Sequence, residues 1–513
     1  MLIPIGLAAA LALAQVPPPD APLRASAELR AARDAIRARE SKALVEVADR
    51  LGGEAPRAIR ARLDPPPDPD GSSRFVPLAE ILPPPGPKSS LPAEVGPIRA
   101  AAARAFFDLA ARGLGADPPH LALADECLRE VVARDPGHAE AHRLLGYLPH
   151  GGGWATPFAV DKQKRGFVLH PTFGWVEADW VPHLDRGELP APRVAGRPTR
   201  WLPVAEADEL RREFAKGWQI STEHFLVVTN VPLSEAIDFG RRLEALYDLF
   251  FSIMADVIGP DLPLYQLARK PGEAPGLPKR THQVWYFADK EQYIRCLQPV
   301  QGEGVRDNLG TYLPAREAKA FGKGGKSFFF RDPGGQLDVT ETLYHEVSHQ
   351  LLFESGVADR YDPARGQFWV LEGLGTYFET LRPQPDGSLR YGGLVGRRIE
   401  VAQERLIEKK EFIPIGRLTT MNKFAFNGGG GGDIYLNYVE AMALTVYLMQ
   451  AHDRRHREGF LDYARDAYRG RVHGNVGRKL DDRLGTGFAE LDRDFLAYIR
   501  PAATPRPATT GGR

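Results

Sequence analysis

Cysteine is scarce in this chain, with Cys127 and Cys296 the only two in 513 residues. A disulfide between them is left open by the sequence. One bridge cannot hold a chain of this length together, which excludes the disulfide-dense secreted scaffolds. The 66 basic residues balance the 66 acidic ones, so no net charge attracts the chain to nucleic acid. With 43% hydrophobic residues, the chain can bury at least two cores.

Long hydrophobic runs are missing after the N-terminus, so we expect no membrane span. Residues Met1 to Ala14 are apolar and end in an A-x-A-like cleavage site before Gln15. We interpret this segment as a signal peptide cleaved near Ala14 and expect a secreted or periplasmic protein. Because the segment has no Lys or Arg before its apolar core, a buried N-terminal helix is the alternative interpretation.

An HExxH pattern runs from His345 to His349. On a helix, positions i and i+4 share one face, so both imidazoles can reach a single metal ion. Glu346 points aside, where it can hold and deprotonate a metal-bound water without becoming a ligand. A capping box at Asp338 and a stop at Gly356 predict a helix of about five turns around the motif.

A second helical pattern contains Glu372, which follows His349 after 22 intervening residues. A catalytic zinc site needs a third protein ligand and keeps its fourth position open, and Glu372 is placed to supply that ligand. Glu372 and Glu379 fall on one face of this helix and apolar residues on another. Gly373 and Gly375 each cost about 1 kcal/mol inside a helix, so we expect two backbones to approach closely there. A surface helix with solvated acids is the alternative.

The two patterns together resemble the gluzincin metallopeptidases, in which HExxH is followed by W-x-x-E-G-x-A-x-Y-x-E. The resemblance implies that His345, His349 and Glu372 bind one Zn²⁺ per chain. It also implies that Glu346 is the general base and that Glu379 is the second acidic position of the downstream helix. The expected activity is hydrolysis of peptide bonds in a peptide or protein substrate.

The chain departs from the gluzincin pattern at two positions. Gly375 replaces the usual Ala, and Thr376 stands where thermolysin-like members carry an Asp that orients a ligand histidine. Another group must therefore orient that histidine here. The G-A-M-E-N anchor of aminopeptidases is absent. More closely, residues 215–450 look like a bacterial family of secreted, peptidase-like proteins known only as a domain of unknown function, which implies no particular substrate.

A further helix is expected from Tyr435 to Gln450, after a glycine run at residues 428–432. In gluzincins, a helix after the zinc site often supplies a Tyr that hydrogen-bonds the oxyanion of the tetrahedral intermediate. The resemblance makes Tyr438 the candidate for this role and Tyr435 the reserve. Tyrosine at helical spacing is also typical of a core aromatic, which is the alternative.

The fold class we expect is α+β, with a helical and irregular N-terminal accessory region. Short β-like runs predict strands, and a long apolar repeat predicts a helix at residues 234–258. The expected strands cover residues 223–229, 264–268, 283–287, 310–313 and 327–331. The resemblance implies two lobes, a mixed-sheet lobe and a helical lobe, with the cleft between them. It also implies that the strand at 327–330 pairs with an extended substrate, unless that strand is buried.

The domain organisation follows from the composition along the chain. Residues 15–99 read as a helix and a Pro-rich linker. Residues 100–218 read as a helical accessory region with one tetratricopeptide-like helix pair and a Trp-containing loop or β module, and we expect a protein partner to bind its helices. The metallopeptidase-like domain spans residues 219–500, and 501–513 form a disordered tail.

The sequence therefore predicts a secreted zinc-dependent metallopeptidase. The alternative is a non-catalytic secreted protein that uses the same fold as a scaffold for binding. An intact Glu346 between the two histidines favours the enzyme, because a scaffold has little need of a base there.

Overall fold

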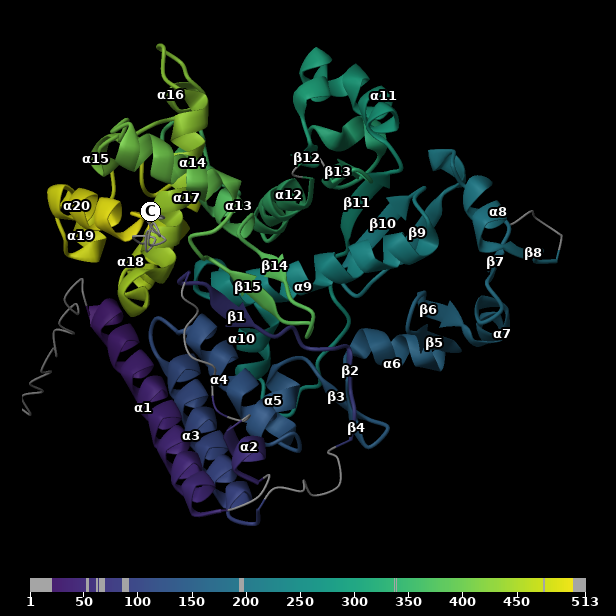
Figure 1. Cartoon of the computed structure of the whole chain (residues 1–513), viewed down its shortest axis with the longest axis horizontal. Coiled ribbons are helices and arrows are strands. Elements are labelled where there is room, and N and C mark those ends of the chain that lie inside the picture. The colour runs from purple at the N-terminus through teal and green to yellow at the C-terminus, as the bar shows by residue number, and fades with distance from the viewer. Residues whose placement is uncertain are drawn as a thin grey trace, which may run out of the picture.

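A computed structural model describes residues 21–501, with gaps at 52–54, 61–62, 64–69, 85–91, 193–197, 336, 338 and 474–475. The interpretations of a signal peptide and of a C-terminal tail therefore lie outside the described residues, as do Asp338 and much of the Pro-rich stretch. The described part has an α+β fold with several small sheets (Figure 1). None of its helices is long and apolar enough to cross a membrane.

Helices form the N-terminal part, at the base of the molecule in Figure 1. They are α1 (Ala21–Arg50), α2 (Ala55–Arg60), α3 (Val95–Gly115), α4 (Leu121–Arg134) and α5 (Ala139–Leu144). α3 packs along both α1 and α4, around a core that includes Phe106 and Leu128. α5 has only six residues, so the long neighbour of α4 is α3 rather than the second helix of a tetratricopeptide-like pair.

The Trp-containing stretch forms three small β-hairpins. They join β3 (Leu148–His150) to β4 (Gly153–Ala155), β5 (Phe167–His170) to β6 (Gly174–Glu177), and β7 (Glu188–Pro190) to β8 (Trp201–Pro203). Trp154 stacks on His142 with ring centroids 4.4 Å apart, and Trp175 donates a hydrogen bond of 2.6 Å to Glu80. These two indoles are thus engaged in packing within the chain.

A five-stranded mixed sheet lies beside the motif helix. Its order is β12 (Gly310–Leu313), β13 (Lys326–Phe330), β11 (His282–Phe287), β10 (Phe225–Thr229) and β9 (Trp218–Ser221). The three central strands are parallel, and the two outer strands run antiparallel to their neighbours. α9 (Leu233–Ile258) connects β10 to β11, the crossover that a parallel pair requires. Four of the five expected strand-like runs are strands here, and β9 is an addition.

The fifth expected strand, at 264–268, is wrong: Pro263–Ala268 form helix α10. Pro263 stands in the first turn, where its fixed φ suits a helix and its missing N–H costs nothing. Leu267 is buried among the N-terminal helices, so tertiary packing favours the helical conformation.

The expectation that residues 327–330 pair with a substrate is also wrong, because β13 lies between β11 and β12 and both its edges are occupied. All five of its residues are buried, as the alternative interpretation held. The outer edge on this side of the sheet belongs to β12.

Three helices build the centre of the molecule: α12 (Val339–Glu354), α13 (Phe368–Phe378) and α17 (Ile434–Arg454). α13 packs against α12 on one side and against α17 on the other, and all of its residues are buried. α12 ends two residues before Gly356, whose φ of +83° is the left-handed stop that the sequence indicated.

Further helices lie around this centre: α14 (Arg397–Ala402), α15 (Ile415–Leu418), α16 (Lys423–Phe426), α18 (Arg457–Tyr468), α19 (Leu480–Leu484) and α20 (Phe488–Tyr498). α11 (Lys290–Gln301) instead packs against β11 and β13 of the five-stranded sheet. A small sheet joins β1 (Ser73–Phe75) to β15 (Leu389–Tyr391) and β14 (Arg382–Pro383), so the N-terminal region pairs with the segment after α13. Cys127 is buried in α4 and Cys296 lies in α11, and both are free thiols.

Candidate metal centre

Three buried side chains from α12 and α13 converge on one point. His345 Nε2 lies 3.0 Å from His349 Nε2, and Glu372 Oε2 lies 3.3 Å and 3.8 Å from these two nitrogens. The three side chains each offer one ligand atom, and these atoms all lie within 4.8 Å of one another. The structure thus brings together the three residues that the sequence predicted as metal ligands.

The donor set fits a zinc ion. Bonds of about 2.0–2.2 Å at tetrahedral angles place two ligand atoms about 3.3–3.5 Å apart, and the three observed separations bracket that range. Burial raises the pKa of Glu372, but hydrogen bonding to His345 and His349 lowers it, and the net shift is downward. The carboxylate is therefore ionised at neutral pH, as a ligand must be.

Glu379 sets the tautomer of His345. Glu379 Oε1 lies 2.9 Å from His345 Nδ1, and because an ionised carboxylate can only accept, the ring donates from Nδ1. That leaves the Nε2 lone pair free and aimed at His349 and Glu372. Glu379, about one helical turn after Thr376, thus supplies the carboxylate that orients the histidine and that Thr376 lacks. Thr376 instead donates its hydroxyl to the backbone carbonyl of Glu372.

Arg398 on α14 completes this chain of contacts. Its Nε donates a 2.6 Å hydrogen bond to Glu379 Oε2, and Glu379 is only 4% exposed. Burial raises the pKa of Glu379, but His345 and Arg398 lower it, and the net shift is downward. The sequence analysis did not find Arg398. The one feature that could have pointed to Arg398 is that a carboxylate buried beside a ligand histidine needs a cationic partner.

Glu346 lies beside the three ligands and is held from the sheet. The backbone N–H of Tyr312 on β12 donates 2.8 Å to Glu346 Oε2, which leaves Oε1 without that constraint. Burial raises the pKa of Glu346, although the nearby His345 and His349 act in the opposite direction. A carboxylate with a raised pKa is a better proton acceptor, as a general base requires.

The two glycines of α13 have separate structural reasons. A Cβ on Gly375 would lie 2.9 Å from Cε1 of both His345 and His349, so the imidazoles rest directly on the helix backbone. A Cβ on Gly373 would lie 2.5 Å from Thr445 Oγ1 and 3.1 Å from the carbonyl oxygen of Ala441. The expected close approach of two backbones therefore occurs at Gly373, towards α17, whereas Gly375 makes room for two side chains of α12.

Tyr438 on α17 reaches the same site. Burial, the charges of Glu372 and Glu346, and a hydrogen bond to Glu372 all raise the pKa of Tyr438. Its ring also packs against the ring of Phe426, with 5.1 Å between the centroids, as the alternative of a core aromatic expected. Its hydroxyl group lies beside the carboxylate of Glu372. Tyr435 is 41% exposed at the start of the helix.

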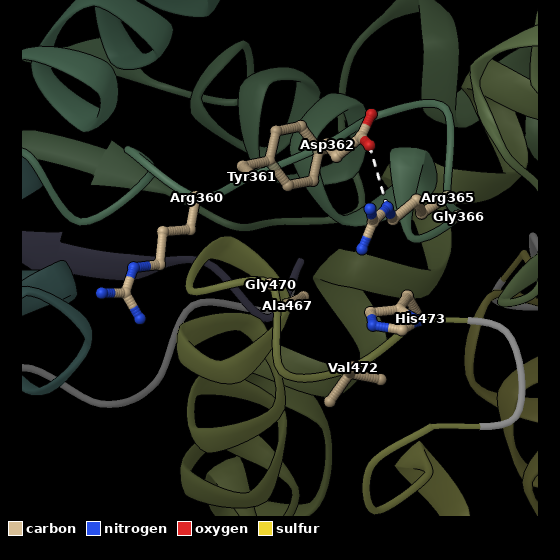
Figure 2. Close-up of a pocket in the computed structure, with 9 residues that line it drawn as sticks. All are labelled: Arg360, Tyr361, Asp362, Arg365, Gly366, Ala467, Gly470, Val472 and His473. Carbon is tan, nitrogen blue, oxygen red and sulfur yellow. Dashed lines mark ion pairs between the residues drawn. The ribbon is translucent and has the colours of Figure 1, made fainter.

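A separate pocket of about 220 Å³ lies where the loop before α13 meets the segment after α18. Figure 2 shows Arg365 and His473 facing this space, with Arg365 paired to Asp362 and Arg360 turned away. None of the four predicted site residues on α12 and α13 lines this pocket. It is distinct from the metal centre.

A family model described as a protein of unknown function (DUF1570) matches residues 339–470. The match begins with the first residue of α12 and includes α13, α14 and α17. All five predicted site residues therefore lie within it, and so do Glu379 and Arg398. The match starts later than the 215–450 region of the expected resemblance. No curated protein matches the chain.

Proposed function

We propose that this chain is a zinc-dependent peptidase of the gluzincin type, with the cleft between the five-stranded sheet and the helical lobe. One observation carries the proposal: three buried ligand atoms from His345, His349 and Glu372 converge beside a separately held Glu346. A cluster made only for stability has no need of a fourth ionisable group held apart from the other three.

His345, His349 and Glu372 would hold the zinc, which when bound would supply Lewis-acid activation of a water at neutral pH. Glu346 removes a proton from the attacking water through its free Oε1 and passes it to the leaving amine. Its raised pKa suits both steps, because the group must accept and then release a proton. The phenolic hydroxyl of Tyr438 donates a hydrogen bond to the oxyanion that develops on the substrate carbonyl.

An extended peptide pairs with the outer edge of β12. Because β12 is antiparallel to β13, its residues alternate between facing β13 and facing outwards, and Tyr312 uses its outward N–H on Glu346. The same strand therefore orients the base and presents backbone groups to the substrate. This arrangement suits a peptide or protein substrate rather than a compact small molecule.

Glu346→Gln is the experiment that separates a catalyst from a binding scaffold. The amide keeps the size of the side chain but cannot accept the proton, so zinc content should stay near one per chain. Turnover of a quenched fluorescent peptide library should fall about 10²–10⁴-fold. Glu317→Gln, an exposed change on the loop after β12, is the matched control and should leave both quantities unchanged.

Equal turnover in wild type and Glu346→Gln would reject catalysis by this site. Zinc at one per chain without any hydrolysis in wild type would instead support the non-catalytic scaffold.

A further inference from the structure

A cavity of about 110 Å³ lies between the N-terminal helices and the half of the chain that carries the metal centre. Its walls come from α1, α4 and α9 and from β1, β15 and α18. One water needs about 10–15 Å³ of such space, so this cavity has room for a small organic or inorganic ion. It shares no residue with the metal centre.

Positive charge dominates the lining of this cavity. Three carboxylates line it, from Glu126, Asp256 and Glu458. Six arginines line it: Arg30, Arg33, Arg74, Arg129, Arg454 and Arg457. Arg74 is exposed, but the other five guanidinium groups are largely withdrawn from water, which is unfavourable for a cation that has no anionic partner.

Four of the six arginines already have carboxylate partners. Arg30 pairs with Glu458. Arg33 lies 2.8 Å from Glu126. Arg74 lies 2.9 Å from Asp386 and Arg129 lies 2.8 Å from Asp125. Partners therefore exist for every arginine of the cavity except two.

Arg454 and Arg457 are those two. Within the described part of the chain, neither guanidinium has a carboxylate within 4 Å, and the hydrogen bond that Arg454 makes is to Ser73 Oγ at 2.8 Å. Asp256 makes no ion pair with either guanidinium, and its Oδ1 accepts hydrogen bonds from the backbone N–H groups of Leu121 and Ala122 at 2.6 Å and 3.2 Å. The cavity thus holds two guanidinium groups that make no direct ion pair, and the charge of Glu126, which is already paired with Arg33, acts on both only from a distance.

The backbone that carries Arg454 is strained. His452, Asp453 and Arg454 have φ values of 51°, 54° and 64°, three successive non-glycine residues in the left-handed region. Such conformations cost about 1 kcal/mol or more each and persist only where the surroundings enforce them. This non-helical turn at the end of α17 directs Arg454 towards the cavity, where Arg457 begins α18.

We infer that Arg454 and Arg457 together bind one small oxyanion, a phosphate group or a carboxylate, in this cavity. The planar guanidinium presents paired N–H donors that match the oxygens of either group. Because the walls come from the N-terminal helices and from the metal-bearing half, the bound anion joins these two parts of the chain. This site is independent of the proposed peptidase activity.

Isothermal titration calorimetry of the full chain in chloride buffer tests the inference, with inorganic phosphate and succinate as separate probes. Wild type should bind one anion per chain, with a Kd on the order of 0.1–1 mM for at least one probe. Arg454→Gln and Arg457→Gln should each weaken binding at least about tenfold, as expected for a charge-assisted bidentate contact. Arg455→Gln is the matched control, because Arg455 points to Asp494 outside the cavity and its loss should leave the Kd unchanged.

A phosphate ion could also bind at zinc, so the titration is repeated in a His349→Ala background, where the cavity should bind phosphate with the same Kd. Binding of phosphate alone identifies a phosphoryl ligand, and binding of succinate as well identifies a general oxyanion site. No heat with either probe at about 20 mM, a concentration well above the expected Kd, overturns the inference.

Hydrogen exchange on wild type keeps the test valid even if an arginine variant fails to fold. Phosphate should protect amides near residues 73–75 and 457–461, which come from the two sides of the cavity. Protection elsewhere without protection at these two segments would place the anion at another site and reject the inference.

Discussion

The backbone N–H of Tyr312 donates a hydrogen bond of 2.8 Å to Glu346 Oε2. Tyr312 lies on the outermost strand of the five-stranded sheet, and Glu346 lies on the motif helix, 34 residues later. The register of β12 against β13 therefore sets the orientation of the proposed base. A one-residue slip of β12 would turn this N–H away from Glu346 and towards β13.

His349→Ala should remove the metal. Two imidazoles and one carboxylate form the whole proposed ligand set, so losing one should leave too few donors to retain zinc against a chelator. Mass spectrometry of purified protein should find about one zinc per wild-type chain and far less in the variant. His473→Ala, a histidine of the separate pocket in Figure 2, is the control. Stoichiometric zinc at unchanged affinity in His349→Ala would show that the ligand assignment is wrong.

Glu379→Gln and Arg398→Gln should weaken zinc binding without removing a ligand. Glu379 holds His345 in the tautomer that exposes Nε2, and Arg398 holds Glu379. Removing such outer contacts typically costs about 10–100-fold in metal affinity, and the loss should be larger for Glu379 than for Arg398. Competition with a fluorescent zinc chelator measures both. Affinities equal to wild type would show that His345 is oriented by other means.

Tyr438→Phe should lower kcat with little change in KM, because the hydroxyl is proposed to act only on charge that develops in the transition state. Loss of one oxyanion donor costs about 10²–10³-fold in kcat. Tyr435→Phe is the matched control on the same helix, since Tyr435 is exposed and should be neutral. Peptidase kinetics at constant zinc content decide the matter. If Tyr435→Phe shows the larger loss, the two tyrosines have been assigned in the wrong order.

Gly375→Ala should weaken zinc binding, whereas Gly373→Ala should mainly destabilise the fold. The new methyl at 375 would press on the two ligand rings, and the methyl at 373 would press on Thr445 and on the backbone of α17. Overpacking of this kind costs about 1–3 kcal/mol in the free energy of unfolding. Urea unfolding of metal-free protein together with zinc titration separates the two effects. The opposite pattern, with zinc affinity lost only in Gly373→Ala, would contradict the assigned contacts.

His456 should make the free energy of unfolding fall in mild acid. Burial, and then the charge of Arg455, lower the pKa of His456 to about 4, whereas an unfolded histidine titrates at about 6.5. Between these two pH values the unfolded state binds a proton that the folded state does not bind. The contribution of neutral His456 to the free energy of unfolding is therefore complete above pH 6.5 and is lost as the pH falls towards 4.

From pH 7 to pH 5 this loss amounts to about 2 kcal/mol. The free energy of unfolding measured in urea should fall by that much more for wild type than for His456→Gln, which cannot take up the proton. Parallel pH profiles for the two proteins would show that His456 is not buried in its neutral form.

Local patterns in the sequence predicted much of the site. The four-residue spacing of His345 and His349 determines that they share a helical face, and the apolar repeat around Glu372 predicts the helix that returns it to them. These inferences concern residues on one helix or on two neighbouring helices, where periodicity is informative. The same reasoning found four strands of the sheet, but it mistook 264–268 for a strand because a short apolar run does not distinguish strand from helix.

Only the tertiary structure decided how distant segments meet. Tyr312 contacts Glu346 because β12 lies beside α12, and Arg398 contacts Glu379 because α14 lies beside the end of α13. No local periodicity in the sequence predicts either contact. The position of β13 inside the sheet, and the meeting of Arg454 with the N-terminal helices, depend likewise on long-range packing. Sequence alone thus identified the residues of the candidate site, and the fold determined what holds and orients them, because burial and partner choice are properties of the assembled core.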